Sequence, residues 1–336
     1  MKVAAITGPR QCSLVDKPDP RPAGDIVVVK VHAAPMCTEY KAYAAGWGGD
    51  CLGHEAAGEV VQVAQPGKVS VGDRVVVMPL SPCGQCPHCL AGQYIHCQSG
   101  IDPVALTGSG AGNATYAQYL LKSDWMLLPI PEGMSYDHAS MACCGIGPTF
   151  GAMQRMNAGA FDTVLITGLG PVGLGGVINA VYCGAKVIAV DTNPYRANLA
   201  RKLGAAAVVD PSKDDALQQI LDLSGGGIDK AVDCSGVPQA QRLMIDALKR
   251  RGQACFVGEA GDLTIRISND MIRKGISLHG QWHWSMADAP LIMKLIADST
   301  DKLNTLITHT FPMSDVGKAW ELQLTGQCGK IVLHPW

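Results

Sequence analysis

The sequence predicts an α/β protein in which a β-rich domain is joined to a doubly wound parallel-sheet domain. Its 336 residues suffice for about two domains. With 47% hydrophobic and 17% charged residues, the chain can bury two cores. Up to about residue 135, short apolar runs alternate with glycine- and proline-rich turns. From about residue 163, strand-like and helix-like segments alternate, as in a parallel sheet with crossover helices.

In the first part of the chain, apolar runs at Ile26–Val31, Ala57–Val63 and Arg74–Met78 predict β-strands. Turn-forming stretches such as Val71-Gly72-Asp73 separate them. We therefore expect a β-rich domain over residues 1–140, with a cysteine-rich lobe at 80–100.

The second part of the chain predicts five strands, at 163–167, 186–190, 206–209, 230–233 and 254–257. Helices are expected between them at 171–183, after Pro194, at 214–223 and at 238–250. These elements predict a parallel-sheet domain over residues 141–278. After about residue 280 the alternation stops, and residues 329–333 resemble a strand. We expect residues 279–336 to return to the first domain.

Charge and composition exclude several classes of protein. The net charge of −2 gives no basic surface, which argues against a nucleic-acid partner. The N-terminus has no long apolar core, so we expect no secretory signal. The uncharged stretch 163–185 contains many glycines and Pro171, which suits a strand, a turn and a helix better than a membrane span. We expect a soluble cytoplasmic protein whose thirteen cysteines are thiols or metal ligands.

A glycine-rich turn predicts dinucleotide binding. Gly168, Gly170 and Gly173 form a GxGxxG pattern between an apolar strand and a helix that begins with Pro171 and Val172. The first glycine permits a tight turn, the second lets a pyrophosphate approach, and the third allows the helix to pack against the strand. The phosphates would lie at the helix N-terminus.

The acid that ends the next strand indicates which dinucleotide binds. Asp191 lies 18 residues beyond Gly173, where its carboxylate can accept hydrogen bonds from ribose hydroxyls and repel a 2′-phosphate. Arg196 could instead bind that phosphate, or be a solvated residue or a cation stacked on adenine. Because Asp191 is present, we expect NAD rather than NADP.

Four cysteines within fifteen residues predict a structural metal site. Their order is Cys83, Cys86, Cys89 and Cys97. Four thiolates close a tetrahedral zinc site and leave no open position. An iron–sulfur cluster is the competing interpretation, because four cysteines also hold clusters. His88 and His96 are surplus to a closed site, and we expect both at the surface.

A second group of candidates is dispersed along the chain. Cys37, His54 with Glu55, and the pair Cys143-Cys144 are each weak evidence alone. Two thiolates with one imidazole leave the fourth position of zinc open, which is the catalytic arrangement. Spacing does not show that these residues meet.

The order of all these motifs resembles that of the zinc-dependent medium-chain dehydrogenases, which include alcohol and polyol dehydrogenases. The resemblance covers essentially the whole chain, including Val232–Gly236 and Gly329–Leu333. It implies a GroES-like catalytic domain built from both chain ends, a Rossmann domain between them, NAD, and two zinc ions per chain. It also implies a homo-dimer or homo-tetramer and a small alcohol or polyol as substrate.

The sequence departs from this family after Cys37. Such proteins usually read Cys-x-Ser/Thr-Asp-x-His, in which the hydroxyl and the histidine relay a proton. Without a gap, Glu39 falls on the hydroxyl position, Tyr40 on the acid and Ala42 on the histidine. With one residue deleted, Thr38 supplies the hydroxyl and Glu39 the acid. Both alignments retain the zinc ligands and leave the proton route open.

The resemblance also bears on the third catalytic ligand. Cys144 lies 24 residues before Gly168, the usual separation in the bacterial relatives that this chain resembles. We therefore expect Cys144 to be the ligand and Cys143 to be a packed thiol. Glu55 would orient the metal site or enter the zinc sphere itself.

These observations predict NAD-dependent oxidation of an alcohol, in which zinc lowers the pKa of the substrate hydroxyl and hydride passes to the nicotinamide. Polar residues near Cys37 favour a polyol or sugar, whereas Trp47 and a wall formed by Trp282 and Trp284 would favour an apolar substrate. The alternative is a non-catalytic NAD-binding scaffold or sensor that holds only the structural zinc.

Overall fold

The computed structural model describes residues 1–259 and 261–336. The chain forms two compact units. The first unit comprises Met1–Gly145, Ser285–Asp298 and Ile307–Trp336, and the second comprises Ile146–Trp284 and Ser299–Leu306. The chain passes into the second unit after residue 145 and returns to the first after residue 284, where the sequence suggested boundaries at 140 and 278. Residues 299–306, expected in the returning segment, belong instead to the second unit.

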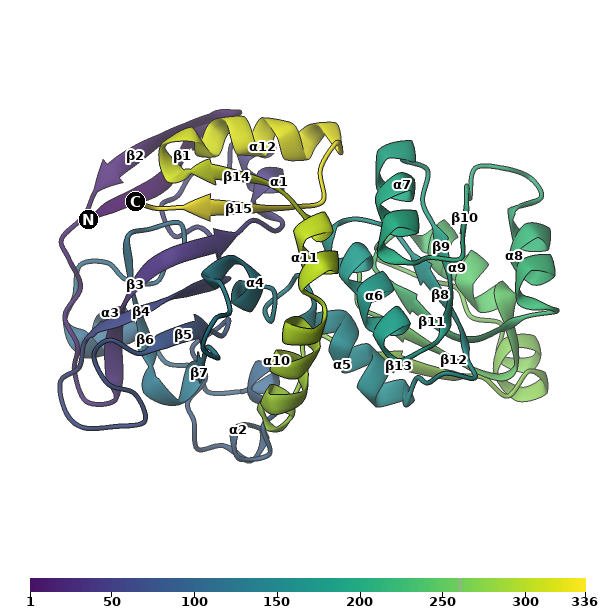
Figure 1. Ribbon diagram of the computed structural model, residues 1–336, viewed down its shortest axis with the longest axis horizontal. Helices are drawn as coiled ribbons and strands as arrows, with labels where there is room; N and C mark the ends of the chain where they lie inside the picture. Colours follow the sequence, from purple (N-terminus) through teal and green to yellow (C-terminus); the bar gives the residue numbers. More distant parts are fainter. Residues whose placement is uncertain (260) are drawn as a thin grey trace. The chain divides into compact units, whose positions relative to one another are not determined.

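The first unit is built on an antiparallel hairpin and a larger mixed sheet, in which only β14 and β15 pair in parallel among the described strands. Strands β1 (Lys2–Gly8) and β2 (Gln11–Asp16) form a hairpin. The larger sheet has the order β14-β15-β3-β4-β5-β7, and β6 also pairs with β3. Its strands are β3 (Ile26–Pro35), β4 (Ala56–Gln62), β5 (Arg74–Val77), β6 (Tyr119–Ser123), β7 (Leu127–Pro129), β14 (Ile307–Pro312) and β15 (Lys330–His334). The C-terminal strand β15 pairs antiparallel with β3, so both chain ends build this unit (Figure 1).

Short helices surround this sheet. They are α1 (Glu39–Ala45), α2 (Pro87–Leu90), α3 (Pro103–Thr107), α4 (Tyr136–Ser140), α10 (Ala289–Asp298) and α12 (Val316–Thr325), with single turns η1 (Tyr94–His96), η2 (Asp124–Met126), η4 (Met286–Asp288) and η5 (Met313–Asp315). In the core, Tyr43 of α1 stacks on Trp320 of α12 with ring centroids 4.8 Å apart. This aromatic pair buries a large apolar area and joins the two helices over the sheet.

The second unit is a six-stranded parallel sheet with the order β10-β9-β8-β11-β12-β13. Its strands are β8 (Thr163–Thr167), β9 (Lys186–Val190), β10 (Ala207–Val209), β11 (Ile228–Asp233), β12 (Leu248–Phe256) and β13 (Ser277–Gly280). In chain order this is the 3-2-1-4-5-6 arrangement of doubly wound dinucleotide-binding sheets. The predicted α/β fold class is confirmed. Strand β13 was not predicted, because its short polar sequence at the sheet edge carries no apolar run.

Helices cover both faces of this sheet (Figure 1). They are α5 (Gly147–Met156), α6 (Pro171–Tyr182), α7 (Pro194–Leu203), α8 (Ala216–Ser224), α9 (Pro238–Ala247), α11 (Thr300–Leu306) and the π-helical segment η3 (Ile267–Arg273). A proline lies in the first turn of α6, α7 and α9, where its missing N–H costs no intrahelical hydrogen bond.

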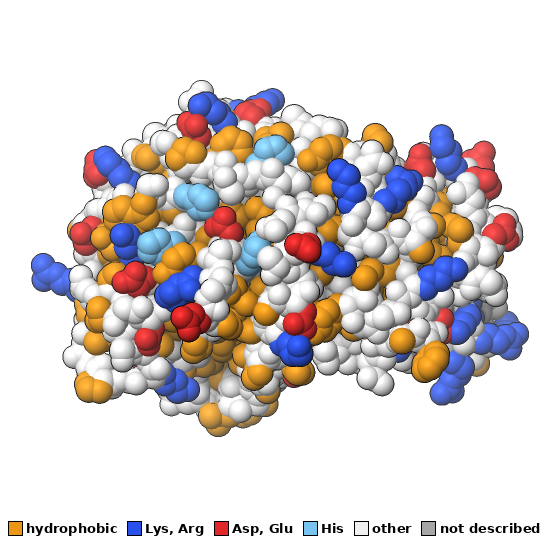
Figure 2. All heavy atoms as spheres, in the orientation of Figure 1, with side chains coloured by type: hydrophobic (Ala, Val, Ile, Leu, Met, Phe, Trp, Pro, Cys, Tyr) orange, Lys and Arg blue, Asp and Glu red, His pale blue; other side chains and the backbone are white. Residues whose placement is uncertain are grey.

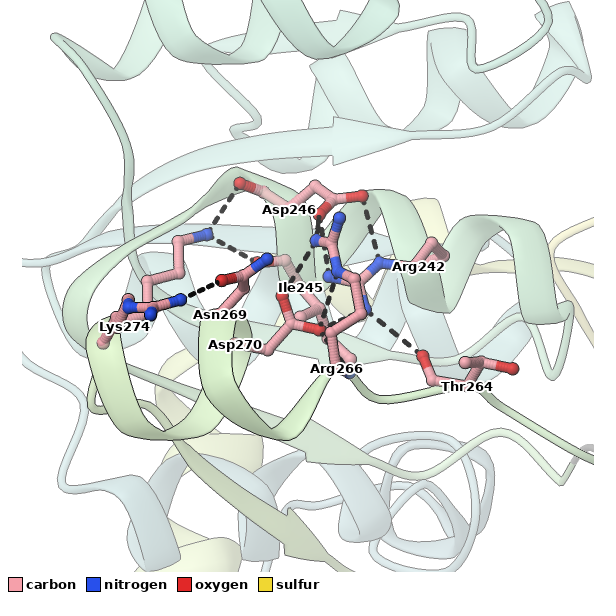
Figure 3. Close-up of polar contacts among 9 residues, drawn as sticks. Arg242, Ile245, Asp246, Thr264, Arg266, Asn269, Asp270 and Lys274 are labelled. Carbon is pink, nitrogen blue, oxygen red and sulfur yellow. Dashed lines mark hydrogen bonds and ion pairs between the residues drawn. The ribbon is translucent and has the colours of Figure 1, made fainter.

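An ion-pair network ties η3 to α9 (Figure 3). Arg242 of α9 contacts Asp246 at 2.7 Å and Asp270 at 2.8 Å, and Arg266 contacts both carboxylates. Burial would raise the pKa of Asp270, but hydrogen bonds from Arg266 and Arg242 hold it well below its usual range. Lys274 adds a bond to the Asp246 carbonyl. The network fixes the segment that precedes β13.

The surface shown in Figure 2 carries basic and acidic side chains intermixed, with no extended field of either sign. This agrees with the balanced charge of the sequence. Across the described part of the chain, every helix is too short or too polar to cross a bilayer.

Candidate metal and dinucleotide sites

The first unit brings together four side chains that are far apart in the sequence. Cys37 follows β3, His54 and Glu55 precede β4, and Cys144 follows α4. Their ligand atoms all lie within 4.8 Å of one another. The Cys144 Sγ lies 3.3 Å from the His54 Nε2. We call these four residues the open quartet, because two thiols and one imidazole would leave one position of a bound zinc ion open. The fourth member, Glu55, is engaged by a lysine, as described below.

A close backbone approach positions His54. Gly53 has a φ of +81°, and a Cβ there would lie 2.3 Å from the Thr115 Oγ1 and 2.5 Å from the Tyr116 ring. Only glycine fits both the left-handed backbone and this contact. The turn therefore holds His54 at a fixed distance from the segment that carries Thr115 and Tyr116.

Glu39 orients His54 and does not face solvent. Its Oε1 lies 2.8 Å from the His54 Nδ1, and its Oε2 accepts hydrogen bonds from the Tyr116 hydroxyl at 2.9 Å and the Cys37 N–H at 3.2 Å. Burial would raise the pKa of Glu39, but its hydrogen bonds with His54 lower it. A carboxylate on the second nitrogen of a ligating histidine fixes the ring and its tautomer.

These contacts match one of the two alignments after Cys37. Glu39 occupies the place of the acid, which corresponds to the alignment in which Thr38 carries the hydroxyl. Thr38 is exposed at the start of α1, and its side chain makes no capping hydrogen bond. The contact between Glu39 and the His54 ring favours this alignment over the ungapped one, which put Glu39 on the hydroxyl position.

Glu55 is fully buried and bridges two partners. It accepts a hydrogen bond from the Lys330 Nζ at 2.6 Å and one from the Cys144 backbone N–H at 3.0 Å. Lys330 of β15 is also fully buried. Burial opposes its charge, but the Glu55 carboxylate raises the pKa of Lys330 above its usual value. The arrangement clamps the Cys144 backbone and leaves Glu55 charge-compensated without a metal.

The two adjacent cysteines have different surroundings. The Cys144 side chain belongs to the open quartet, whereas Cys143 is fully buried and its Sγ donates to the Val77 carbonyl at 3.4 Å. Burial raises the pKa of Cys143, which keeps that thiol protonated. Adjacent side chains leave the backbone in different directions, so only one of them can reach Cys37 and His54.

The four cysteines of the predicted structural site converge within one loop, on and around α2 and η1. Their sulfur atoms also lie within 4.8 Å of one another. Sγ–Sγ distances are 3.5 Å for Cys86–Cys89, 3.5 Å for Cys83–Cys97 and 3.9 Å for Cys86–Cys97. Tetrahedral zinc with Zn–S bonds of about 2.3 Å places its sulfurs about 3.8 Å apart, so the group fits the ion. All four are free thiols, and His88 and His96 are exposed.

In the second unit, the glycine-rich turn has the steric features that its sequence predicts. Gly168 has a φ of +81°, and a Cβ there would lie 2.6 Å from the Ser235 backbone. A Cβ on Gly173 would lie 1.8 Å from the Gly168 carbonyl oxygen, whereas a Cβ on Gly170 would meet nothing within 4 Å. Gly170 caps α6 without a side chain, and Pro171 and Val172 follow it. The turn leaves space for an anion at Gly170, and the start of α6 offers that anion backbone N–H groups.

Asp191 lies directly beside this turn. Its carboxylate accepts hydrogen bonds from the Leu169 N–H at 2.6 Å and the Asn193 N–H at 2.8 Å. Arg196 is half-buried in the first turn of α7, and its Nε has no hydrogen-bond partner in the described part of the chain. The carboxylate is therefore placed at the glycine turn, with one guanidinium on the following helix.

Three residues of the metal site were not singled out as site residues. Lys330 holds Glu55, Tyr116 holds Glu39, and the Gln323 side-chain amide donates to the Cys37 carbonyl at 3.2 Å. Lys330 lies in the 329–333 stretch that was noted only as a strand. No local pattern marks any of the three, because each acts through a ligand that is distant in the sequence.

One expectation about substrate-facing residues is wrong. Trp284 is 1% exposed and packs edge-to-face on Phe150, with ring centroids 6.3 Å apart. It therefore belongs to a core and cannot form an open wall with Trp282. Trp47 is 71% exposed. Glu39, counted as a sign of polarity toward substrate, is instead engaged by His54.

Comparison with protein families matches both parts of the chain. Residues 23–132 match the alcohol dehydrogenase GroES-like domain, which confirms the GroES-like prediction. Residues 171–298 match the zinc-binding dehydrogenase domain.

Individual proteins agree over nearly the full length. An uncharacterised zinc-type alcohol dehydrogenase-like protein of Escherichia coli is 30% identical over 99% of this chain and 98% of its own. An L-threonine 3-dehydrogenase of Alteromonas mediterranea is 32% identical over 95% of each chain. Among solved structures, an alcohol dehydrogenase from Thermus sp. ATN1 has a TM-score of 0.88 at 22% identity over 100% of both chains. The galactitol-1-phosphate dehydrogenase of Escherichia coli has a TM-score of 0.86 at 23% identity, also over 100% of both chains.

Proposed function

The chain belongs to the zinc-dependent medium-chain dehydrogenases, and on that premise we propose that it is an NAD-dependent enzyme that oxidises a secondary alcohol, polyol or sugar. The observation that carries this proposal is the open quartet, in which Cys37, His54 and Cys144 meet at one point. Two thiolates and an imidazole are the donor set of a catalytic zinc with one free position. A scaffold that held only structural zinc would have no need of this convergence.

We propose that the chain binds two zinc ions. Cys83, Cys86, Cys89 and Cys97 would hold the structural ion. Cys37, His54 and Cys144 would hold the catalytic one, with Glu55 as a neighbour that fixes the Cys144 backbone. When bound, zinc supplies a Lewis acid for the substrate oxygen, and NAD supplies the hydride acceptor.

The protein's own residues would orient and deprotonate the substrate. Glu39 holds the His54 ring through Nδ1, so its Nε2 points into the quartet. Thr38, exposed next to Cys37, is the hydroxyl that would accept the substrate proton at its Oγ1 and pass it to solvent. Glu39 would then serve the imidazole alone and not the proton route.

For the cofactor, we propose that Gly168, Gly170, Pro171, Val172 and Gly173 cradle the pyrophosphate and that Asp191 binds the adenosine ribose of NAD. Asp191→Ser should lower kcat/KM for NAD⁺ and relax rejection of NADP⁺, because the 2′-phosphate no longer meets a negative charge. Arg196→Ala is the matched variant and should change NAD⁺ use little. A wild-type enzyme that prefers NADP⁺ contradicts the assignment.

The function is tested by measuring zinc per chain and NADH formation with a panel of alcohols. The panel contains L-threonine, galactitol 1-phosphate and neutral 2,3-butanediol, since the similar proteins include enzymes named for the first two compounds. We expect two zinc ions per chain and turnover of at least one compound. One zinc ion and no turnover with any alcohol would favour the scaffold.

A further inference from the structure

A cavity of about 320 Å³ opens in the first unit beside His54. Its wall includes Leu80 before the cysteine lobe, Thr115 after it, and Lys122 on β6. The volume is in the range of small-molecule sites. Because His54 belongs both to this wall and to the open quartet, a molecule in the cavity lies next to the residues proposed to hold the catalytic zinc.

Lys122 brings an uncompensated positive charge to the cavity. The residue is 8% exposed, and its ammonium donates one hydrogen bond, to the Leu80 carbonyl at 2.6 Å. Within residues 1–259 and 261–336, no carboxylate forms an ion pair with it. Burial lowers the pKa of Lys122 to about 8, as expected for a desolvated ammonium without a counter-charge. Its ammonium carries three N–H groups, and the Leu80 carbonyl is the acceptor of one of them.

Thr115 supplies a second unused polar group. It is 5% exposed, and its Oγ1 has no hydrogen-bond partner among the described residues. A buried hydroxyl without a partner costs about 1–3 kcal/mol, so such groups are rare unless a ligand or water completes them. This hydroxyl lies against Gly53, the residue before His54, and both Thr115 and His54 line the cavity.

The cavity wall is also strained at Leu80. This residue has a φ of +63°, a left-handed conformation that a leucine adopts at a cost of about 1–2 kcal/mol. Its carbonyl is the one bonded to Lys122. The Asp102 carboxylate also lies in the wall, where hydrogen bonds from the Ala105 and Val104 N–H groups at the start of α3 hold its pKa below the usual value. Among the described residues it forms no ion pair with Lys122.

We propose that this cavity binds an anionic group of the substrate, a carboxylate or a phosphate, with Lys122 as its charged partner and Thr115 as a hydroxyl donor. The proposal rests on the proposed function and narrows its substrate to hydroxylated acids or phosphorylated polyols. An anion would supply the counter-charge that Lys122 lacks and a partner for the Thr115 hydroxyl. The substrate's alcohol would then be held at a fixed distance from the open quartet.

Steady-state kinetics on the zinc-loaded full chain test the anion site, with L-threonine, galactitol 1-phosphate and 2,3-butanediol as substrates. We expect Lys122→Met to raise KM for the preferred anionic substrate about tenfold or more, with kcat changed much less. Thr115→Val should raise KM by about threefold. Preference for L-threonine identifies a carboxylate site, and preference for galactitol 1-phosphate a phosphate site. Lys68→Met, which removes an exposed lysine of the same unit, is the matched control.

Calorimetry gives a readout that is independent of turnover. Inorganic phosphate and acetate are titrated separately into the wild type and into Lys122→Met without cofactor. Tighter binding of one anion to the wild type, by about tenfold, supports the site even if no alcohol is oxidised, in which case only the proposed function fails. Equal anion affinities of the two proteins overturn the proposal. So does a KM for anionic substrates that Lys122→Met leaves unchanged.

Discussion

The first unit contains two groups of metal-ligating side chains that are built in opposite ways. The four-cysteine group takes all its ligands from residues 83–97, on one loop with two short helical turns. The open quartet takes its side chains from three separate segments between residues 37 and 144, one after β3, one before β4 and one after α4. In both groups the ligand atoms lie within 4.8 Å of one another.

The difference lies in what surrounds the ligands. In the lobe, the sulfur atoms contact one another and nearby backbone N–H groups, such as that of Cys83. In the open quartet, Glu39 holds His54, and Lys330 holds Glu55. A structural site needs only closure, whereas a site for chemistry also needs a fixed ring, a fixed tautomer and an open position. The comparison predicts that damage to the lobe affects folding and damage to the quartet affects turnover.

The largest effect should come from Cys144. Cys144→Ser should remove the labile zinc and lower turnover about a thousandfold or more, because it deletes a ligand of the proposed Lewis acid. Zinc content and NADH formation measure both outcomes. Cys143→Ala is the matched control and should keep the metal and a substantial rate. If zinc content follows Cys143, the ligand assignment is off by one residue.

Loss of a lobe cysteine should act on stability first. Cys86→Ser should lower the melting temperature by roughly 5 °C or more or reduce solubility, since a closed zinc site is coupled to folding.

Mild chelation should abolish turnover of the wild type while its far-UV circular dichroism persists, because the open site exchanges ligands with solvent. Simultaneous loss of fold and activity on mild chelation would contradict two distinct sites.

A smaller effect is expected from the residue that orients His54. Glu39→Gln should lower zinc affinity or kcat about 10- to 100-fold, the usual range for a carboxylate behind a ligating histidine. Tyr116→Phe removes only one hydrogen bond to Glu39 and should change both by less than about tenfold. Metal titration of both variants measures the difference. Equal effects of the two variants would contradict the role of the Glu39 carboxylate in orienting His54.

Local patterns predicted most elements of the second unit closely, but the helix expected at 238–250 ends at Ala247, and β12, expected from residue 254, begins at Leu248. The strand expected at 163–167 is β8, and the helix expected at 171–183 is α6, which ends at Tyr182. These elements carry their own signals, an apolar run and a proline followed by small residues. The cysteine lobe was predicted for the same reason, because its ligands lie within fifteen residues. Strand β13 was missed because its sequence is polar and pairing with β12 defines it.

By itself, the sequence determined the α/β class, the glycine turn with Asp191, the four-cysteine group and the set of candidates for an open metal site. These features depend on spacing along the chain. The separation from Gly168 already favoured Cys144 over Cys143. The tertiary structure alone assigned Glu39 to the imidazole and brought Lys330 from the C-terminal strand to Glu55. It also placed Trp284 in a core and, among the described residues, left Lys122 without an ion pair. The physical reason is that burial and pairing of charged groups are set by strands and loops far apart in sequence, which no local spacing encodes.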